Sequence, residues 1–66
     1  MTQIERLVSM AEDELDRRGV CLDWSFPDER DKVAFKVYEW LKNQNHKVPL
    51  ESVQRLYEEY AREVGV

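Results

Sequence analysis

Apolar residues recur with a helical period near the N-terminus of the chain. The positions that share this face are Ile4, Leu7, Val8, Ala11 and Leu15. Thr2 and Glu5 have the spacing of a capping box, in which two side chains satisfy backbone N–H groups at the start of a helix. Gly19 suits a helix end because glycine readily adopts a positive φ. The pattern predicts an amphipathic helix over residues 3–18.

The next segment alternates apolar residues with smaller or polar ones. Its apolar positions are Val20, Leu22, Trp24 and Phe26. Alternation of this kind places the four side chains on one side of an extended segment. A lone strand would have no pairing partner within this chain, so we expect an extended connector whose apolar side chains fill the core. An edge that pairs with a strand of another protein is the alternative.

A second helical pattern follows and runs to Lys42 or Asn43. Ser25 or Asp28 is expected to cap its start, and Pro27 is tolerated in the first turn. At about 100° per residue, one broad apolar face is formed by Val33, Ala34, Val37, Tyr38, Trp40 and Leu41. Phe35 projects well away from the centre of this face, so its ring is difficult to bury.

A polar linker over residues 43–47 separates this helix from a third one. Asn residues in the linker can adopt the left-handed conformation that ends a helix, and Pro49 is suited to the first helical position. The apolar face of the third helix is predicted to carry Leu50, Val53, Leu56, Tyr57, Tyr60, Ala61 and Val64, and Gly65 ends the helix. The sequence therefore predicts an all-α fold: a compact three-helix bundle with an extended connector between the first two helices, forming a single domain over residues 1–66.

Length and cysteine content point to a small protein of a reducing compartment. A chain of 66 residues is too short to divide its core between domains. Its one cysteine, Cys21, cannot form an intramolecular disulfide, and we expect it to be a small buried apolar residue in a cytoplasmic protein. The chain has no long apolar run, and Glu5 and Arg6 interrupt the region where a signal peptide would be apolar, so no membrane association is expected.

The residues that usually carry catalysis or metal binding are sparse. Cys21 and His46 are the only cysteine and histidine, and they are too far apart in sequence to suggest a metal-ligand cluster or a nucleophile with its base. The two glycines, Gly19 and Gly65, cannot form a phosphate-binding loop. The carboxylates Glu12, Asp13, Glu14, Glu58 and Glu59 are expected on solvated helix faces. We therefore predict no enzyme activity, catalytic residue, metal, cofactor or small-molecule substrate.

Large aromatic residues are numerous for so small a core, which favours a protein-interaction module. Exposed Trp, Tyr and Phe residues are typical of binding hot spots. Phe35 and Trp40 are the leading candidates, and they lie on opposite margins of the second helix's apolar stripe. Trp24, Lys32 and Lys36 are the next candidates. The partner is another protein or a second copy of the chain in a homodimer; alternatively, the two leading rings simply fold over the edge of the core.

A DNA-binding regulator is the alternative function, because the second helix, the linker and the third helix superficially read as a helix-turn-helix. The third helix would present Glu51, Glu58 and Glu59 to phosphates beside Arg55 and Arg62, and the linker is longer than usual. A modest basic flank near Trp40 consists of Lys32, Lys36, Lys42 and Lys47. The net charge of −4 and an acidic front half further disfavour nucleic acid, although that acidic half could imitate phosphates toward a nucleic-acid-binding protein.

Overall fold

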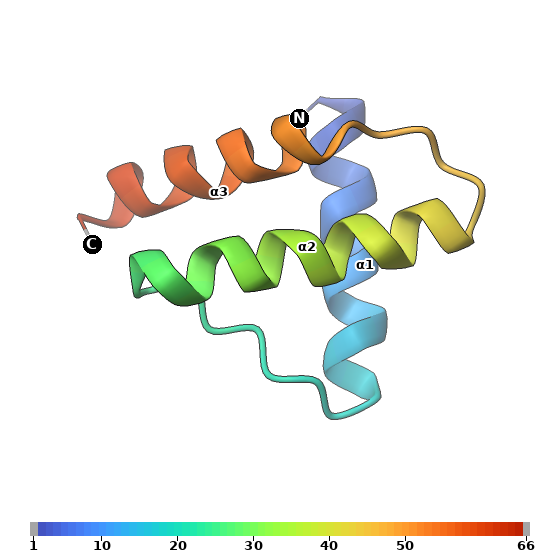
Figure 1. The fold of residues 1–66 in the computed structure, drawn as a ribbon, viewed down its shortest axis with the longest axis horizontal. Coiled ribbons are helices and arrows are strands. Elements are labelled where there is room, and N and C mark those ends of the chain that lie inside the picture. Colours follow the sequence, from blue (N-terminus) through green and yellow to red (C-terminus); the bar gives the residue numbers. More distant parts are fainter. Residues whose placement is uncertain (1, 66) are drawn as a thin grey trace.

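Three α-helices form the computed structural model, which describes residues 2–65 and contains no strand over that range. They are α1 (Gln3–Arg17), α2 (Pro27–Asn43) and α3 (Leu50–Val64). α2 and α3 run in opposite directions and α1 crosses them (Figure 1), with contacts between all three pairs of helices. Within the described residues, no helix has both the length and the apolar character to cross a membrane. The predicted all-α three-helix fold is confirmed.

The ends of α1 follow the sequence pattern closely. The backbone N–H of Glu5 donates to Thr2 Oγ1 at 3.3 Å, and the backbone N–H of Thr2 donates to Glu5 Oε1 at 3.5 Å, which completes the predicted capping box. Gly19 adopts a φ of 80°, which allows the chain to leave the helix without strain on a side chain. α1 ends at Arg17, one residue earlier than predicted.

The starts of α2 and α3 differ from the prediction. Neither Ser25 nor Asp28 caps α2: its N-cap is Phe26, Pro27 takes the first helical position, and no side chain among the described residues caps the first turn. Pro49 is the N-cap of α3 rather than its first residue. Asn45, with a φ of 64°, adopts the predicted left-handed conformation in the linker.

The core lies where the three helices meet. Its fully buried side chains include Val8 from α1, Leu41 from α2 and Tyr57 from α3, the last being the largest. Each such side chain stabilises the fold by about 1.5–3 kcal/mol relative to an exposed one. Val64 is a wrong core prediction, because it lies in the last turn of α3 and is 62% exposed.

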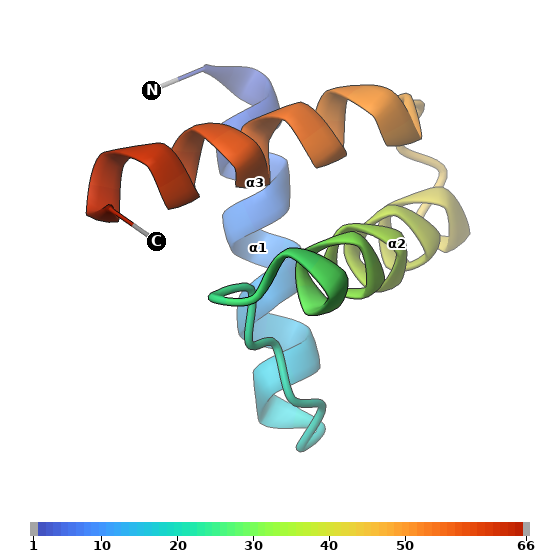
Figure 2. The ribbon, with the colours of Figure 1, turned by 60° about the vertical axis from the view of Figure 1, so that its left-hand side comes forward.

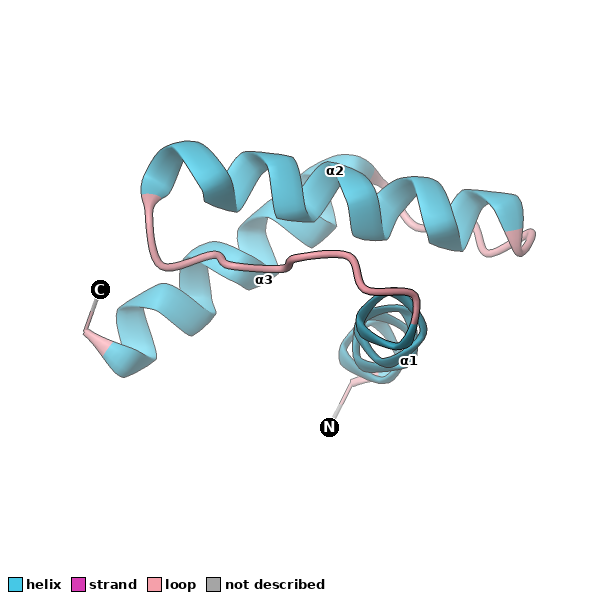
Figure 3. Ribbon diagram, turned by 90° about the horizontal axis from the view of Figure 1, so that it is seen from below, coloured by secondary structure: helices cyan, strands magenta, loops and turns pink. Residues whose placement is uncertain are grey.

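The connector between α1 and α2 is an extended loop (Figure 3), and its burial follows the predicted alternation over most of its length. Val20, Leu22 and Trp24 pack against the core. Phe26 is 64% exposed, contrary to prediction, because the chain bends at residues 25–26 to enter α2 and the alternation ends there. Cys21 is also exposed rather than buried, since the alternation that buries its neighbours directs it to the opposite side.

A buried arginine, Arg30 of α2, fastens the connector to two helices. Its side chain is 7% exposed. Nε donates to the Trp24 carbonyl at 3.1 Å, and Nη2 donates to the Ser25 carbonyl at 3.4 Å. Nη1 donates to Glu58 Oε2 of α3 at 3.2 Å. One guanidinium therefore holds the end of the connector between α2 and α3.

Candidate functional site

Phe35 stands on the surface of α2 beside a second aromatic ring. Its side chain is 48% exposed, as its position on the helix predicts. Tyr38, one turn further along, is half-buried and packs against the core. The two ring centroids are 6.2 Å apart, with an angle of 40° between the ring planes. Phe35 is thus supported on one side by Tyr38 and open to solvent on the other.

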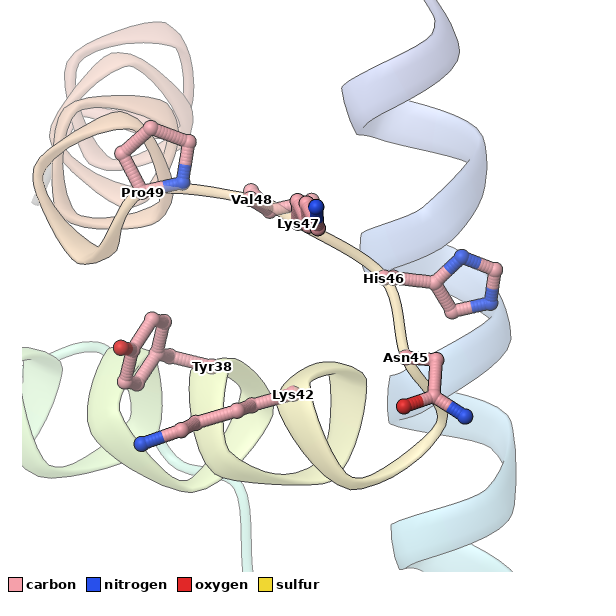
Figure 4. A pocket seen from close by; sticks show the side chains of 7 residues that line it. All are labelled: Tyr38, Lys42, Asn45, His46, Lys47, Val48 and Pro49. Atoms are coloured by element: carbon pink, nitrogen blue, oxygen red, sulfur yellow. The ribbon is translucent and has the colours of Figure 1, made fainter.

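An open hollow of about 490 Å³ adjoins Tyr38, between α2 and the linker to α3. Figure 4 shows the Tyr38 ring rising from α2 toward Pro49, with Lys42 following on the same helix. The linker residues Asn45, His46, Lys47, Val48 and Pro49 line the rest of it. We call Phe35 together with this hollow the Phe35 surface. It combines an exposed ring with a depression large enough for a partner's side chain.

The charge of this hollow is opposite to that of the whole chain. Lys42 and Lys47 are exposed and no carboxylate is among the seven lining residues, whereas the chain carries a net charge of −4. The His46 ring points toward α1 (Figure 4), where it also lines a neighbouring hollow with Ile4 and Leu7. The hollow of the Phe35 surface is therefore lined by apolar and basic side chains.

Trp40 and Lys36, two of the predicted site residues, lie on another side of α2. Trp40 is half-buried over the edge of the core, beside Val20 of the connector and Leu15 of α1. Its Nε1 atom is buried and has no hydrogen-bond partner among the described residues. Lys36 Nζ donates to the Cys21 carbonyl at 3.4 Å. Trp40 thus packs against the connector, which agrees with the alternative prediction that this ring folds over the edge of the core.

Trp24 and Lys32, the other two predicted site residues, do not line the hollow beside Tyr38 either. Trp24 is half-buried and packs against Tyr57 and Tyr60 of α3, with ring centroids at 6.3 and 6.0 Å respectively. Lys32 is exposed and forms an ion pair with Glu29 at 3.4 Å. The five residues predicted from the sequence therefore do not form one site. Among them, only Phe35 belongs to the Phe35 surface.

The sequence prediction missed the residues that complete the Phe35 surface. Tyr38 was assigned to the core, and Lys42 and Lys47 to a basic flank near Trp40. The spacing of three residues between Phe35 and Tyr38 was a signal that the two rings share a helix face. No sequence signal predicted that the linker would bring Lys47 and Pro49 next to Tyr38 of α2.

One carboxylate that was predicted to be solvated lies instead at the edge of the core. Glu12 of α1 is half-buried beside Tyr57. Burial raises the pKa of its carboxyl, the Tyr57 hydroxyl lowers it and the Asp13 charge raises it further. Burial also raises the pKa of Tyr57, and the charge of Glu12 adds to that rise. Glu12 therefore carries its charge in an unfavourable environment.

Among residues 2–65, no three His, Cys, Asp or Glu side chains are grouped so that they could hold a metal ion. No model of a known protein family, no curated protein and no solved structure matches this chain.

Proposed function

We propose that this chain is a non-catalytic, cytoplasmic protein-interaction module that binds a partner protein through the Phe35 surface. The observation that carries the proposal is the exposed Phe35 ring, which is supported by Tyr38 and adjoins a hollow of about 490 Å³. A rigid, half-exposed aromatic side chain next to an apolar depression has the properties of a binding hot spot.

The lysines of the hollow support a different protein as the partner rather than a second copy of the chain. In a two-fold symmetric dimer the same patch meets itself, so Lys42 and Lys47 would face lysines of the other copy. Like charges facing each other at an interface are unfavourable. A partner segment with an apolar side chain and flanking carboxylates would complement both the hollow and its rim.

The arrangement of the basic residues gives little support to the DNA-binding alternative. Lys32 is paired with Glu29, and Lys36 binds the connector, which leaves Lys42 and Lys47 together at the hollow. On α3, Glu51, Glu58 and Glu59 are all exposed. Phosphates near this helix would be repelled where a recognition helix must attract them.

A comparison of two phenylalanine variants tests the proposal. Phe35→Ser removes the exposed ring from the Phe35 surface, and Phe26→Ser removes a ring that is even more exposed but lies in the connector. The immobilised wild-type protein and the Phe26→Ser variant should capture the same protein from a cytoplasmic extract, and the Phe35→Ser variant should lose it. Equal capture by all three proteins would overturn the proposal, and release of the captured material by nuclease would favour the DNA-binding alternative.

A further inference from the structure

A second hollow, of about 330 Å³, lies where α1, α3 and the connector meet. Figure 2 shows α3 crossing α1 above the connector that leads into α2. Its walls include the rings of Trp24 and Tyr60 and the carboxylates of Glu5, Glu12 and Glu63. We call it the Trp24 hollow. It shares no lining residue with the hollow of the Phe35 surface, so conclusions about the two are independent.

The two aromatic rings that line the Trp24 hollow are held in place by contacts with the core. The Trp24 and Tyr60 ring centroids are 6.0 Å apart, and both rings pack against Tyr57, which is fully buried. Arg30 fixes the Trp24 backbone through the hydrogen bond from Nε to the carbonyl at 3.1 Å. The face of an aromatic ring carries negative charge density, which attracts cations. The wall is therefore a preformed surface for a positively charged group.

The charged side chains that line the Trp24 hollow are all carboxylates. Glu5 is occupied by the capping box with Thr2. Glu12 and Glu63 form no ion pair with any cation among residues 2–65. The buried Tyr57 hydroxyl lies beside Glu12 and is the one neighbouring group that lowers the pKa of that carboxyl. The hollow is thus lined by two aromatic rings and by two carboxylates that are not paired with any cation among residues 2–65.

We propose that the Trp24 hollow binds a basic side chain, arginine or lysine, of a partner protein. A guanidinium can stack on an aromatic face while its N–H groups donate to a carboxylate, which matches the combination of Trp24 or Tyr60 with Glu12 or Glu63. A neutral or anionic side chain would leave the carboxylates uncompensated in a partly desolvated place.

The electrostatics of the surrounding groups agree with this assignment. Burial raises the pKa of Glu12, so its charged form is disfavoured as the protein stands. Burial also raises the pKa of the Tyr60 hydroxyl, and the charges of Glu12, Glu5, Glu63 and Glu59 raise it further. A bound cation would offset both effects, so its binding should lower the pKa of Glu12.

The two tryptophans make a direct test possible, because each indole N–H gives its own NMR signal. Trp24 lines the Trp24 hollow, and Trp40 lies in a different one and serves as an internal control. The probe is the peptide acetyl-Gly-Ser-Arg-Ser-Gly-amide, and the matched control peptide carries citrulline, which is neutral, in place of arginine. We expect the arginine peptide to shift the Trp24 signal in a saturable manner, while the Trp40 signal stays in place and the citrulline peptide has no effect.

Carboxylate variants then identify the site. Glu12→Gln and Glu63→Gln should each weaken binding of the arginine peptide by about two- to fivefold, the effect typical of losing one exposed or half-exposed charge pair. Asp16→Asn removes the same charge from an exposed position of α1 that does not line the hollow, and it should leave the affinity unchanged. Glu12→Gln is suited to this test because it removes a charge that burial disfavours, and circular dichroism of the variant checks that weaker binding does not result from unfolding.

Three results would overturn the proposal. The first is a Trp24 signal that does not move up to millimolar concentrations of the arginine peptide. The second is equal binding of the citrulline peptide, which would show that the positive charge is not recognised. The third is an equal effect of Asp16→Asn and Glu12→Gln, which would reduce the interaction to a diffuse attraction toward an acidic protein. None of these results affects the proposal for the Phe35 surface, which is tested with other residues.

Discussion

Replacement of Arg30 by methionine should destabilise the protein by removing the hydrogen bonds that hold the connector. Methionine keeps most of the length and apolar volume of the side chain but none of its donors. Glu58 and the Ser25 carbonyl belong to exposed residues and can turn to water, whereas the Trp24 carbonyl lies in a half-buried residue. An unpaired buried carbonyl costs about 1–3 kcal/mol.

Two considerations limit the loss of stability expected for Arg30→Met. The Arg30–Glu58 ion pair adds little, because the Glu58 side chain is 55% exposed and such pairs are worth less than about 1 kcal/mol. Methionine also avoids the desolvation cost of a buried guanidinium. We therefore expect the free energy of unfolding to fall by roughly 1–2 kcal/mol. For a domain of this size the melting temperature falls by about 4–8 °C for each kcal/mol.

Thermal and urea denaturation followed by circular dichroism would measure the change. The control is Arg55→Met, because Arg55 is exposed on α3 and its loss should alter stability by no more than about 0.5 kcal/mol. Glu58→Gln should cost less than Arg30→Met, because the two connector carbonyls keep their donor. Equal stability of Arg30→Met and the wild type would refute the reasoning, since the desolvation cost of the arginine would then cancel all three of its hydrogen bonds.

Three further substitutions separate the core, the surface and the half-buried carboxylate. Leu41→Ala, at a fully buried position, should lower the free energy of unfolding by about 2–5 kcal/mol in urea denaturation. Phe35→Ala should leave the melting temperature nearly unchanged; a fall of about 4–8 °C would place Phe35 in the core. Glu12→Gln should raise the free energy of unfolding at neutral pH. Burial raises the pKa of Glu12 in the folded state, so the wild-type protein loses stability as the pH rises through the unfolded and then the folded pKa of this group. Glutamine does not ionise and avoids that loss. Titration of stability should show this gain disappearing well below the ordinary glutamate pKa of about 4.3.

Local sequence signals were enough to predict the three helices, but they gave the wrong N-cap for α2 and the wrong first residue for α3. The capping box and Gly19 fixed the bounds of α1 to within one residue, since both act over a few neighbouring positions. Ser25 does not cap α2 because Pro27 occupies the first helical position, which makes Phe26 the N-cap. The Ser25 backbone N–H is meanwhile bound by Asp23 Oδ1 at 3.1 Å.

Arg30 and Glu12 were missed although their positions carried a signal. Arg30 lies three residues before Val33 and seven before Val37, so helical geometry places it on the buried face of α2. Glu12 lies four residues after Val8, at the edge of the buried face of α1. Glu12 was assigned to a solvated face because of its charge, and no role was assigned to Arg30. A charged residue in phase with an apolar stripe predicts a buried contact with a partner, and Arg30 has such partners.

The surfaces could be predicted only where a single helix determines them. The exposure of Phe35 follows from its angle on α2, whereas the Phe35 surface also needs residues 45–49 to fold back over that helix. The Trp24 hollow needs three segments, because its lining residues come from α1, the connector and α3. Periodicity within each segment cannot specify how the segments meet, since that depends on which side chains fill the core between them.

Arg30 links the stability of the fold to only one of the two surfaces. Its hydrogen bond to the Trp24 carbonyl fixes one wall of the Trp24 hollow, whereas the Phe35 surface is built from α2 and the linker that follows it. The methionine substitution at position 30 should therefore shift the Trp24 indole signal and weaken the binding of the arginine peptide to the Trp24 hollow. The signals of Phe35 and Tyr38 should stay in place while the protein remains folded. Equal disturbance of both surfaces would instead mean that Arg30 supports the whole bundle, with the connector as one part of it.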